Sequence, residues 1–165
     1  MHNRKIESAI FLVMLLVFAG TGYSQSGSPE AAEGILRVIA HRDSPIREIH
    51  VDELKKLYLG KEKEIQGVKV EPLHLHAKSK ERKDFHKQVL KLSLDQYREE
   101  WLKAKLFGAG TSAKPPRSYK SVKSLFILAN KKANALGYLY ESPTSKALEA
   151  EGHIRLIPIR GLATD

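Results

Sequence analysis

A cluster of charged residues surrounds a serine at the predicted start of a helix. The segment HLHAKSKERKDF, residues 74–85, is typical of a strand end, a short loop and the first turns of a helix. Its charged side chains are those of Lys78, Lys80, Arg82 and Lys83, with the acids Glu81 and Asp84. Unpaired N–H groups and the helix dipole already make a helix N-terminus positive, so acids usually collect there. The excess of cations at this corner therefore predicts an anionic partner.

This corner predicts a small anion-binding site. An oxyanion would lie against backbone N–H groups of the first helical turn, with the hydroxyl of Ser79 beside it. The guanidinium of Arg82 is suited to bidentate contact with such a group. The candidate ligand-binding residues are Lys78, Ser79, Lys80, Glu81 and Arg82. Two alternatives stay open: Ser79 could serve only as a helix N-cap, and the lysines could form a solvated face.

Other arrangements of reactive side chains are incomplete. His74 and His76 lie two residues apart on a predicted strand and share a face, so with His86 or His41 they could bind zinc or copper. No nearby acid completes that set, and no metal site is predicted. The chain has no cysteine, which excludes disulfides and thiol nucleophiles. Because no nucleophile and acid–base pair converge and no GxSxG motif occurs, we predict a protein that is not an enzyme and uses no cofactor.

Apolar periodicity predicts the elements that must position these residues. Four strands are expected at Ile35–Arg42, Val68–His76, Leu136–Tyr140 and Ile154–Ile159. Helices are expected at residues 51–59, 79–90, 93–107 and 119–133. The order β-α-β-α-α-α-β-β predicts an α/β fold with a mostly parallel sheet flanked by helices on both faces. Ligands of such sheets bind outside the carboxyl ends of the strands, where the Ser79 loop would lie.

The helices carry their own boundary and packing signals. Gly60 is a predicted C-cap, and Ser93 with Gln96 forms a predicted capping box. The helical residues expected to face inward are Leu54, Leu57, Tyr58, Phe85, Val89, Leu94, Tyr97, Trp101, Leu102, Val122, Leu125, Phe126 and Ala129. Pro72 predicts a bulge or an edge within the second strand.

The N-terminus has the layout of a secretory signal peptide. Arg4 and Lys5 precede a twelve-residue apolar run, Ala9–Gly20, which is short of the roughly 20 residues that span a bilayer. Gly22 and Ser24 are the small residues expected before a cleavage site. We therefore predict a signal peptide at 1–24, a flexible leader at 25–34 and one domain at 35–165, with the mature protein periplasmic or secreted.

The charge points to anionic partners. The chain carries a formal +9, and the segment 1–24 contributes +1 of this through Arg4, Lys5 and Glu7, which leaves +8 on the mature protein. Such an excess favours phosphate-like ligands, anionic lipid or an acidic protein surface. Nucleic acid is not expected, because the protein is predicted to be exported and lacks an aromatic-basic pattern.

Several motifs in one order resemble a known family. They are DELKKLYLGK at 52–61, Ser79 with Phe85, VL at 89–90, S..Q....W.....FGAG at 93–110, PP at 115–116 and ALGYLY at 135–140. Together these resemble the second lobe of the two-lobed periplasmic phosphate-binding proteins of ABC transporters, and more closely their short, single-lobe members. The resemblance covers residues 35–162. It implies a single lobe of the periplasmic binding protein fold and a role in phosphate transport.

The resemblance also implies where an anion would bind. In the two-lobed relatives phosphate lies between the lobes, and the second lobe supplies a Ser-Gly-Thr turn with an Arg shortly before it. Ser79 matches the Ser, whereas Lys80 and Glu81 stand at the Gly and Thr positions and Leu75 stands near the Arg. The implied function is weak binding of phosphate or another oxyanion, with a partner supplying the missing wall. The alternative is an interaction module that has lost its ligand and docks an acidic partner, such as a membrane sensor or transporter component.

Overall fold

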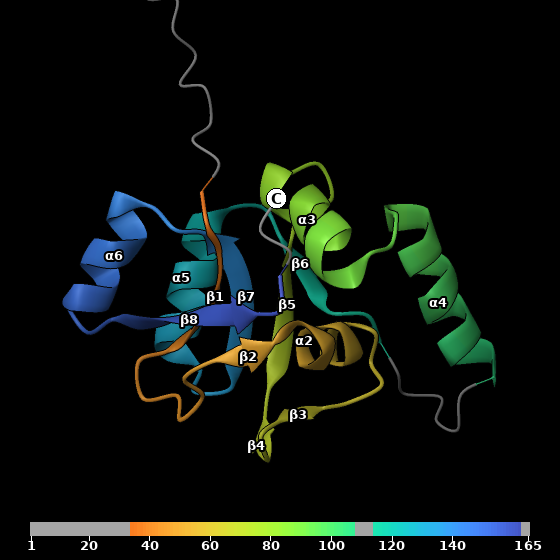
Figure 1. Ribbon diagram of the computed structural model, residues 1–165, viewed down its shortest axis with the longest axis horizontal. Coiled ribbons are helices and arrows are strands. Elements are labelled where there is room, and N and C mark those ends of the chain that lie inside the picture. Colours follow the sequence, from red (N-terminus) through yellow and green to blue (C-terminus); the bar gives the residue numbers. More distant parts are fainter. Residues whose placement is uncertain (1–33, 108–113, 163–165) are drawn as a thin grey trace, which may run out of the picture. The chain divides into compact units, whose positions relative to one another are not determined.

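A six-stranded mixed sheet forms the centre of the part of the chain that the structure describes, residues 34–107 and 114–162 (Figure 1). The structure is a computed structural model. The strands are β1 (Leu36–His41), β2 (Ile49–His50), β5 (Glu71–Leu75), β6 (Arg117–Tyr119), β7 (Ala135–Tyr140) and β8 (Ile154–Arg160). The predicted signal peptide at 1–24 and nearly all of the predicted leader at 25–34 lie outside the described residues.

Five of the six strands run in the same direction. The order across the sheet is β2-β8-β1-β7-β5-β6. Strand β1 is antiparallel to both of its neighbours, β7 and β8, whereas β5 is parallel to β6 and β7, and β2 is parallel to β8. The predicted mostly parallel sheet is therefore confirmed, with β1 as the one reversed strand.

All four expected strands take part in this sheet, with one boundary corrected. The expected strand Val68–His76 is divided: Val68–Lys69 is β4, which pairs with β3 (Glu64–Ile65) in a separate hairpin, and only β5 joins the main sheet. The hairpin turns at Gln66 and Gly67, both with positive φ. Pro72 pairs with β7 before β6 begins its pairing at Leu73, so β5 has a local edge at Pro72, as its lack of an N–H requires.

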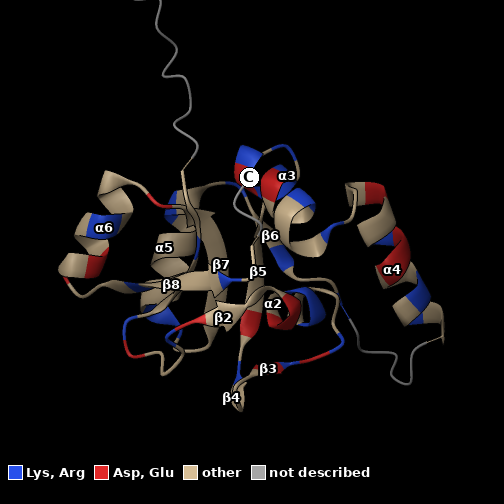
Figure 2. Ribbon diagram, in the orientation of Figure 1, with Lys and Arg blue, Asp and Glu red and all other residues tan. Residues whose placement is uncertain are grey.

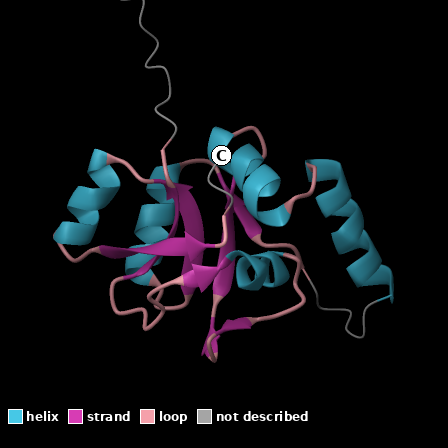
Figure 3. Ribbon diagram, viewed as in Figure 1, coloured by secondary structure: helices cyan, strands magenta, loops and turns pink. Residues whose placement is uncertain are grey.

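Helices cover both faces of the sheet, as predicted (Figure 3). They are α2 (Val51–Tyr58), α3 (Lys80–Phe85), the π-helix η1 (His86–Leu90), α4 (Leu94–Phe107), α5 (Val122–Lys131) and α6 (Pro143–Ala150). Side chains of α2, α3, η1 and α4 share one apolar cluster with Val38 of β1. On the opposite face Ile39 packs with Ala129 of α5, and Leu148 of α6 packs against the same cluster.

Two expectations about the helices were wrong. Helix α6 was not expected, although β7 and β8 run in the same direction and parallel strands need a crossover between them. Leu102 was expected to face inward but is 56% exposed, because α4 buries only a narrow stripe formed by Tyr97 and Trp101. The indole N–H of Trp101 donates to the carbonyl of Tyr58 at 3.3 Å.

The predicted capping box of α4 is confirmed, whereas the predicted C-cap of α2 is off by one residue, because Leu59 is the C-cap and Gly60 follows it. Gly60 follows α2 with φ +72° and lies directly beneath Trp101, where a Cβ atom would come within 2.4 Å of the indole ring. Only glycine fits this position, because both the backbone conformation and the space exclude a side chain. At α4 the Ser93 N–H donates to Gln96 Oε1 at 2.8 Å, and the Gln96 N–H donates to Ser93 Oγ at 3.1 Å.

Candidate functional site

Three serine-capped helices begin at the carboxyl edge of the parallel strands. Strand β5 leads to Ser79 and α3, β6 leads to Ser121 and α5, and β7 leads to Ser142 and α6 (Figure 1). Each serine Oγ accepts the amide N–H three residues further on, at distances of 3.2, 3.3 and 3.2 Å. Three positive helix ends therefore lie along this edge, and each helix N-terminus favours negative charge.

Ser79 acts as the predicted N-cap. Its side chain accepts from the backbone N–H of Arg82, and its carbonyl accepts from the backbone N–H of Lys83 at 3.2 Å. Because a hydroxyl can accept and donate at once, the proton of Ser79 stays available to a ligand oxygen. Capping and contact with an anion are thus compatible roles for this residue.

Most cations of the corner are solvent-exposed, and their charge has no ion-pair partner nearby. Lys78, Lys80 and Lys83 are exposed, and none makes an ion pair with an acid in the described ranges. The ammonium of Lys80 lies 5.3 Å from the ring centroid of Tyr140, within reach of a cation–π interaction. Figure 2 shows how cations and acids alternate along α3. The lysines are free to turn toward an incoming anion.

Neighbouring segments add charge of both signs to this corner. Leu75 of β5 pairs with Tyr119 of β6, so the loop after β6, with the exposed Lys120, lies beside the loop after β5. The carboxylate of Asp84 accepts a hydrogen bond from the hydroxyl of Tyr140. Glu81 is half-buried and makes no ion pair with a described residue, so it would repel an anion at the helix start.

Arg82 points inward. Only 8% of the residue is exposed, and Nη1 donates to the Leu75 carbonyl at 2.9 Å and to Ser118 Oγ at 2.8 Å. The guanidinium carbon lies 5.9 Å from the ring centroid of Tyr97. Arg82 therefore links the end of β5 to β6 from the interior of the protein. The structure brings all five predicted ligand-binding residues to one corner, but an incoming anion would meet the lysines before the guanidinium of Arg82.

Beneath this corner lies a buried histidine held by two tyrosines. Tyr138 Oη lies 2.9 Å from His74 Nδ1, and Tyr97 Oη lies 2.9 Å from His74 Nε2. Because the Tyr97 hydroxyl donates to the Tyr58 carbonyl at 3.1 Å, it accepts from Nε2–H of His74, and Nδ1 accepts from Tyr138. One neutral tautomer satisfies the whole chain of hydrogen bonds. Burial, followed by the charge of Arg82, holds the pKa of His74 well below its usual value.

The histidines considered for metal binding do not form a metal site. Both nitrogens of His74 are occupied by tyrosine hydroxyls, whereas His76 is exposed and accepts from the Lys78 N–H at 3.3 Å. Within residues 34–107 and 114–162, no group of three or more His, Cys, Asp or Glu side chains is arranged to hold a metal ion. His74 instead belongs to the core that supports the corner.

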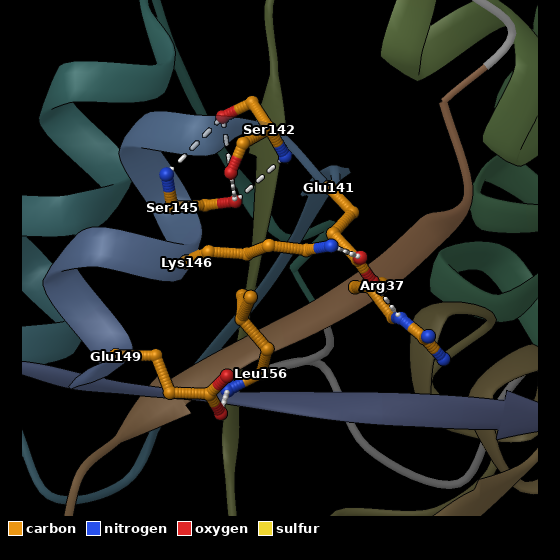
Figure 4. A network of polar contacts seen from close by, with 7 residues as sticks. All are labelled: Arg37, Glu141, Ser142, Ser145, Lys146, Glu149 and Leu156. Carbon is orange, nitrogen blue, oxygen red and sulfur yellow. Dashed lines mark hydrogen bonds and ion pairs between the residues drawn. The ribbon is translucent and has the colours of Figure 1, made fainter.

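The start of α6 has a different charge arrangement (Figure 4). The carboxylate of Glu141 receives Lys146 Nζ at 2.7 Å and Arg37 Nε at 2.6 Å. These two hydrogen bonds, first that of Lys146, lower the pKa of Glu141. Ser145 Oγ accepts from the Ser142 N–H at 2.9 Å, which completes a capping box. The sequence analysis missed this group because it missed α6, although Ser-Pro at 142–143 is a helix-start signal.

The fold is that of a single lobe of a periplasmic binding protein. The chain is similar to a protein described as a phosphate ABC transporter substrate-binding protein with bound phosphate from Clostridium perfringens, with 13% identity and a TM-score of 0.57, covering 79% of this chain and 46% of that one. It is also similar to PstS from Borrelia burgdorferi, with 10% identity and a TM-score of 0.56, covering 80% and 49%.

A third neighbour is an ABC-type phosphate transport receptor from Vibrio cholerae, with 13% identity and a TM-score of 0.55, covering 80% of this chain and 48% of the receptor. The chain thus spans about half the length of these proteins. At the level of sequence, no protein-family model and no curated protein matches it. None of the helices in the described segments is both long and apolar enough to cross a membrane.

Proposed function

We propose that this protein is an exported, non-enzymatic substrate-binding-like protein that binds phosphate or a related oxyanion at the start of α3. The observation that carries the proposal is the exposed lysine group beside the Ser79 cap, at the carboxyl edge of the parallel strands, along which α5 and α6 also begin. Backbone N–H groups, a hydroxyl and mobile ammonium groups are together the donors that an oxyanion requires. The fold shared with one lobe of phosphate receptors supports the same assignment.

The proposed binding is weak and open on one side. Phosphate receptors about twice as long as this chain share its fold over about half of their length. A single lobe offers one wall, so the anion keeps part of its hydration and salt screens the lysines. Glu81 adds a repulsive charge at the site. A partner that covers the open side would raise the affinity. Periplasmic localisation and a single domain at 35–165 belong to this proposal.

The test is a phosphate titration of wild-type protein and a Glu81→Thr variant, at low and at high salt. Glu81→Thr removes the repelling carboxylate, so we expect tighter phosphate binding, by about tenfold for each 1.4 kcal/mol of repulsion removed. The backbone amides of Ser79–Arg82 should report the binding by NMR. Flat titrations for both proteins at millimolar phosphate would refute the proposal.

A second candidate function is a module that docks an acidic protein partner. The inward orientation of Arg82 favours it, because the surface then presents single, flexible ammonium groups rather than a bidentate guanidinium. In this alternative phosphate titrations stay flat, and a synthetic acidic peptide shifts the amides around Lys78 and Lys80 with steep salt dependence. Binding of phosphate with a saturable, salt-resistant component would exclude it.

A further inference from the structure

A pocket at the far end of the α3–η1 helix is lined by a buried imidazole, that of His86. The pocket has a volume of about 530 Å³, and Lys83, His86, Lys87, Lys91 and Ser93 line it. Its lining residues belong to the end of α3, to η1 and to the turn into α4. We call these five residues the η1 pocket. Ser79, at the opposite end of the same helical segment, is not among its lining residues, so the η1 pocket is centred away from the proposed phosphate site and shares only Lys83 with it.

His86 is the residue of the η1 pocket that points to a bound ligand. The residue is 2% exposed, and neither ring nitrogen makes a hydrogen bond of standard geometry with a described residue, although the backbone of Leu92 lies near enough to oppose the lowering of the ring's pKa. Leaving buried polar atoms unsatisfied costs free energy, so native structures rarely tolerate it. The ring is stacked on His74 with centroids 5.7 Å apart and meets Tyr97 edge-on at 4.8 Å, so packing holds it in place.

Three lysines surround the pocket with uncompensated charge. Lys83, Lys87 and Lys91 are exposed and make no ion pair within the described segments. The only acid of the first turn of α4, Asp95, is paired with Arg98 at 2.8 Å. Three ammonium groups around one concave surface raise the local potential for an anion.

The backbone at the pocket is unusual. Residues 86–90 form a π-helix, which is rare and often marks a functional site. Lys91 follows with φ +53° and ψ +41°, a left-handed conformation that costs a non-glycine residue free energy. Glycine would relieve that strain, yet a lysine stands there and lines the pocket. Lys91 therefore places a charged side chain at the pocket where glycine would place none.

We propose that the η1 pocket binds the oxyanion group of a small organic acid or phosphate ester. The lysines neutralise the oxyanion, and a ring N–H of neutral His86 donates to it once the side chains that cover the ring move aside. The N-terminus of α4 at Ser93 adds a positive helix end. Leu92 and Leu94, which also line the pocket, cover the carbon part of the ligand.

The test uses inorganic phosphate and succinate as probes, which carry the two kinds of oxyanion. NMR of the His86 ring and calorimetry on the whole protein should show saturable binding of at least one probe, and the probe with the larger shift identifies the class. In Lys91→Gly we expect affinity to fall about tenfold, equivalent to 1.4 kcal/mol. The same variant should be more stable than wild type, because glycine removes the left-handed strain.

The controls distinguish binding in the η1 pocket from a general effect of positive charge and from binding at the Ser79 corner. Lys131→Ala removes the same charge from α5 on the other face of the sheet and should leave binding unchanged. Lys87→Ala should weaken binding as Lys91→Gly does, which covers the case in which the glycine variant misfolds. An unmoved His86 ring at about 10 mM of each probe, well above a millimolar Kd, overturns the proposal. Shifts confined to the amides of Ser79–Arg82 would do so too, while supporting the proposed function.

Discussion

The starts of α3 and α6 have the same architecture but differ in charge balance. Each follows a parallel strand and begins at a serine that caps the amide three residues on. At α6 the carboxylate of Glu141 is held between Arg37 and Lys146, so charge is balanced within the protein. At α3 the exposed lysines make no ion pair with any residue that the structure describes. The scaffold does not require unbalanced cations at a helix start, which makes those of α3 candidates for a ligand.

The two helix starts also differ in the burial and hydrogen bonding of the nearby arginine. Arg82 is buried and bonded to Leu75 and Ser118, whereas Arg37 is half-exposed and bonded to Glu141. A buried guanidinium that satisfies backbone and hydroxyl oxygens is structural. A half-exposed ion pair contributes little to stability. The predictions below test this division, from the largest expected effect to the smallest.

Among the substitutions, Arg82→Met should have the largest effect on stability. The substitution keeps the volume but leaves the Leu75 carbonyl without its donor, and hydrogen bonds from charged groups contribute about 1.5–3 kcal/mol. We expect the free energy of unfolding to fall by about 2–3 kcal/mol in urea denaturation. Arg117→Met, at an exposed position on β6, is the matched control and should change stability little.

Arg82→Met has a second readout. The charge of Arg82 contributes to the low pKa of His74 and His86, so both values should rise in the variant, as NMR titration of the imidazoles can measure. Unchanged imidazole titrations together with unchanged stability would show that Arg82 is a surface residue in solution, and the contrast with Arg37 would disappear.

Acid should destabilise the α3 side of the sheet first. Burial, followed by the charge of Arg82, lowers the pKa of His86 to about 4 from its ordinary 6.5. The unfolded chain therefore binds this proton more readily, so the contribution of His86 is fully present above pH 6.5 and is lost as the pH falls toward 4. By linkage the loss reaches about 3 kcal/mol, at 1.36 kcal/mol per pKa unit.

His74 adds to the same acid effect, because its pKa is also lowered. Of the buried residues in the described segments, the histidines are His74 and His86, both on the face that α3 covers. Amide hydrogen exchange at pH 5 should therefore accelerate in α2, α3 and η1 before α5 and α6. Uniform acceleration across both faces would contradict the assignment of acid sensitivity to these two rings.

Much of the fold was predictable from local signals, and the site only in part. The apolar strands, the capping box at Ser93 and the glycine after α2 each depend on neighbouring residues. Strands β2 and β6 were missed because two or three residues show no periodicity. The inward position of Arg82 depends on Ser118 of β6, and the position of His86 depends on a π-helix, so neither could be predicted without the tertiary structure.

Removing the two serine caps should lower stability equally but affect phosphate binding unequally. Ser79→Ala and Ser142→Ala each remove one cap, which costs about 1 kcal/mol in thermal or urea unfolding. Only Ser79→Ala should also weaken phosphate binding, because Ser142 lies beside the neutralised Glu141 group. Equal phosphate titrations for both variants and wild type would assign Ser79 to capping alone.

The smallest effect on stability, and the sharpest test of the comparison, is expected from Glu141→Gln. The glutamine keeps the size of the side chain but leaves Arg37 and Lys146 without a negative partner, so we expect a loss below about 1 kcal/mol. The start of α6 then acquires the unbalanced charge of α3.

If cations beside a serine-capped helix start are sufficient to attract phosphate, the amides of Ser142–Ser145 in this variant should shift on titration, as those of Ser79–Arg82 do in wild type. If they stay still while the α3 amides shift, the arrangement around Ser79 matters beyond its charge, and phosphate recognition depends on the neighbouring loop after β6. If neither set shifts, unbalanced charge at a helix start attracts no phosphate in this protein, and the lysines of α3 are better explained by an acidic protein partner.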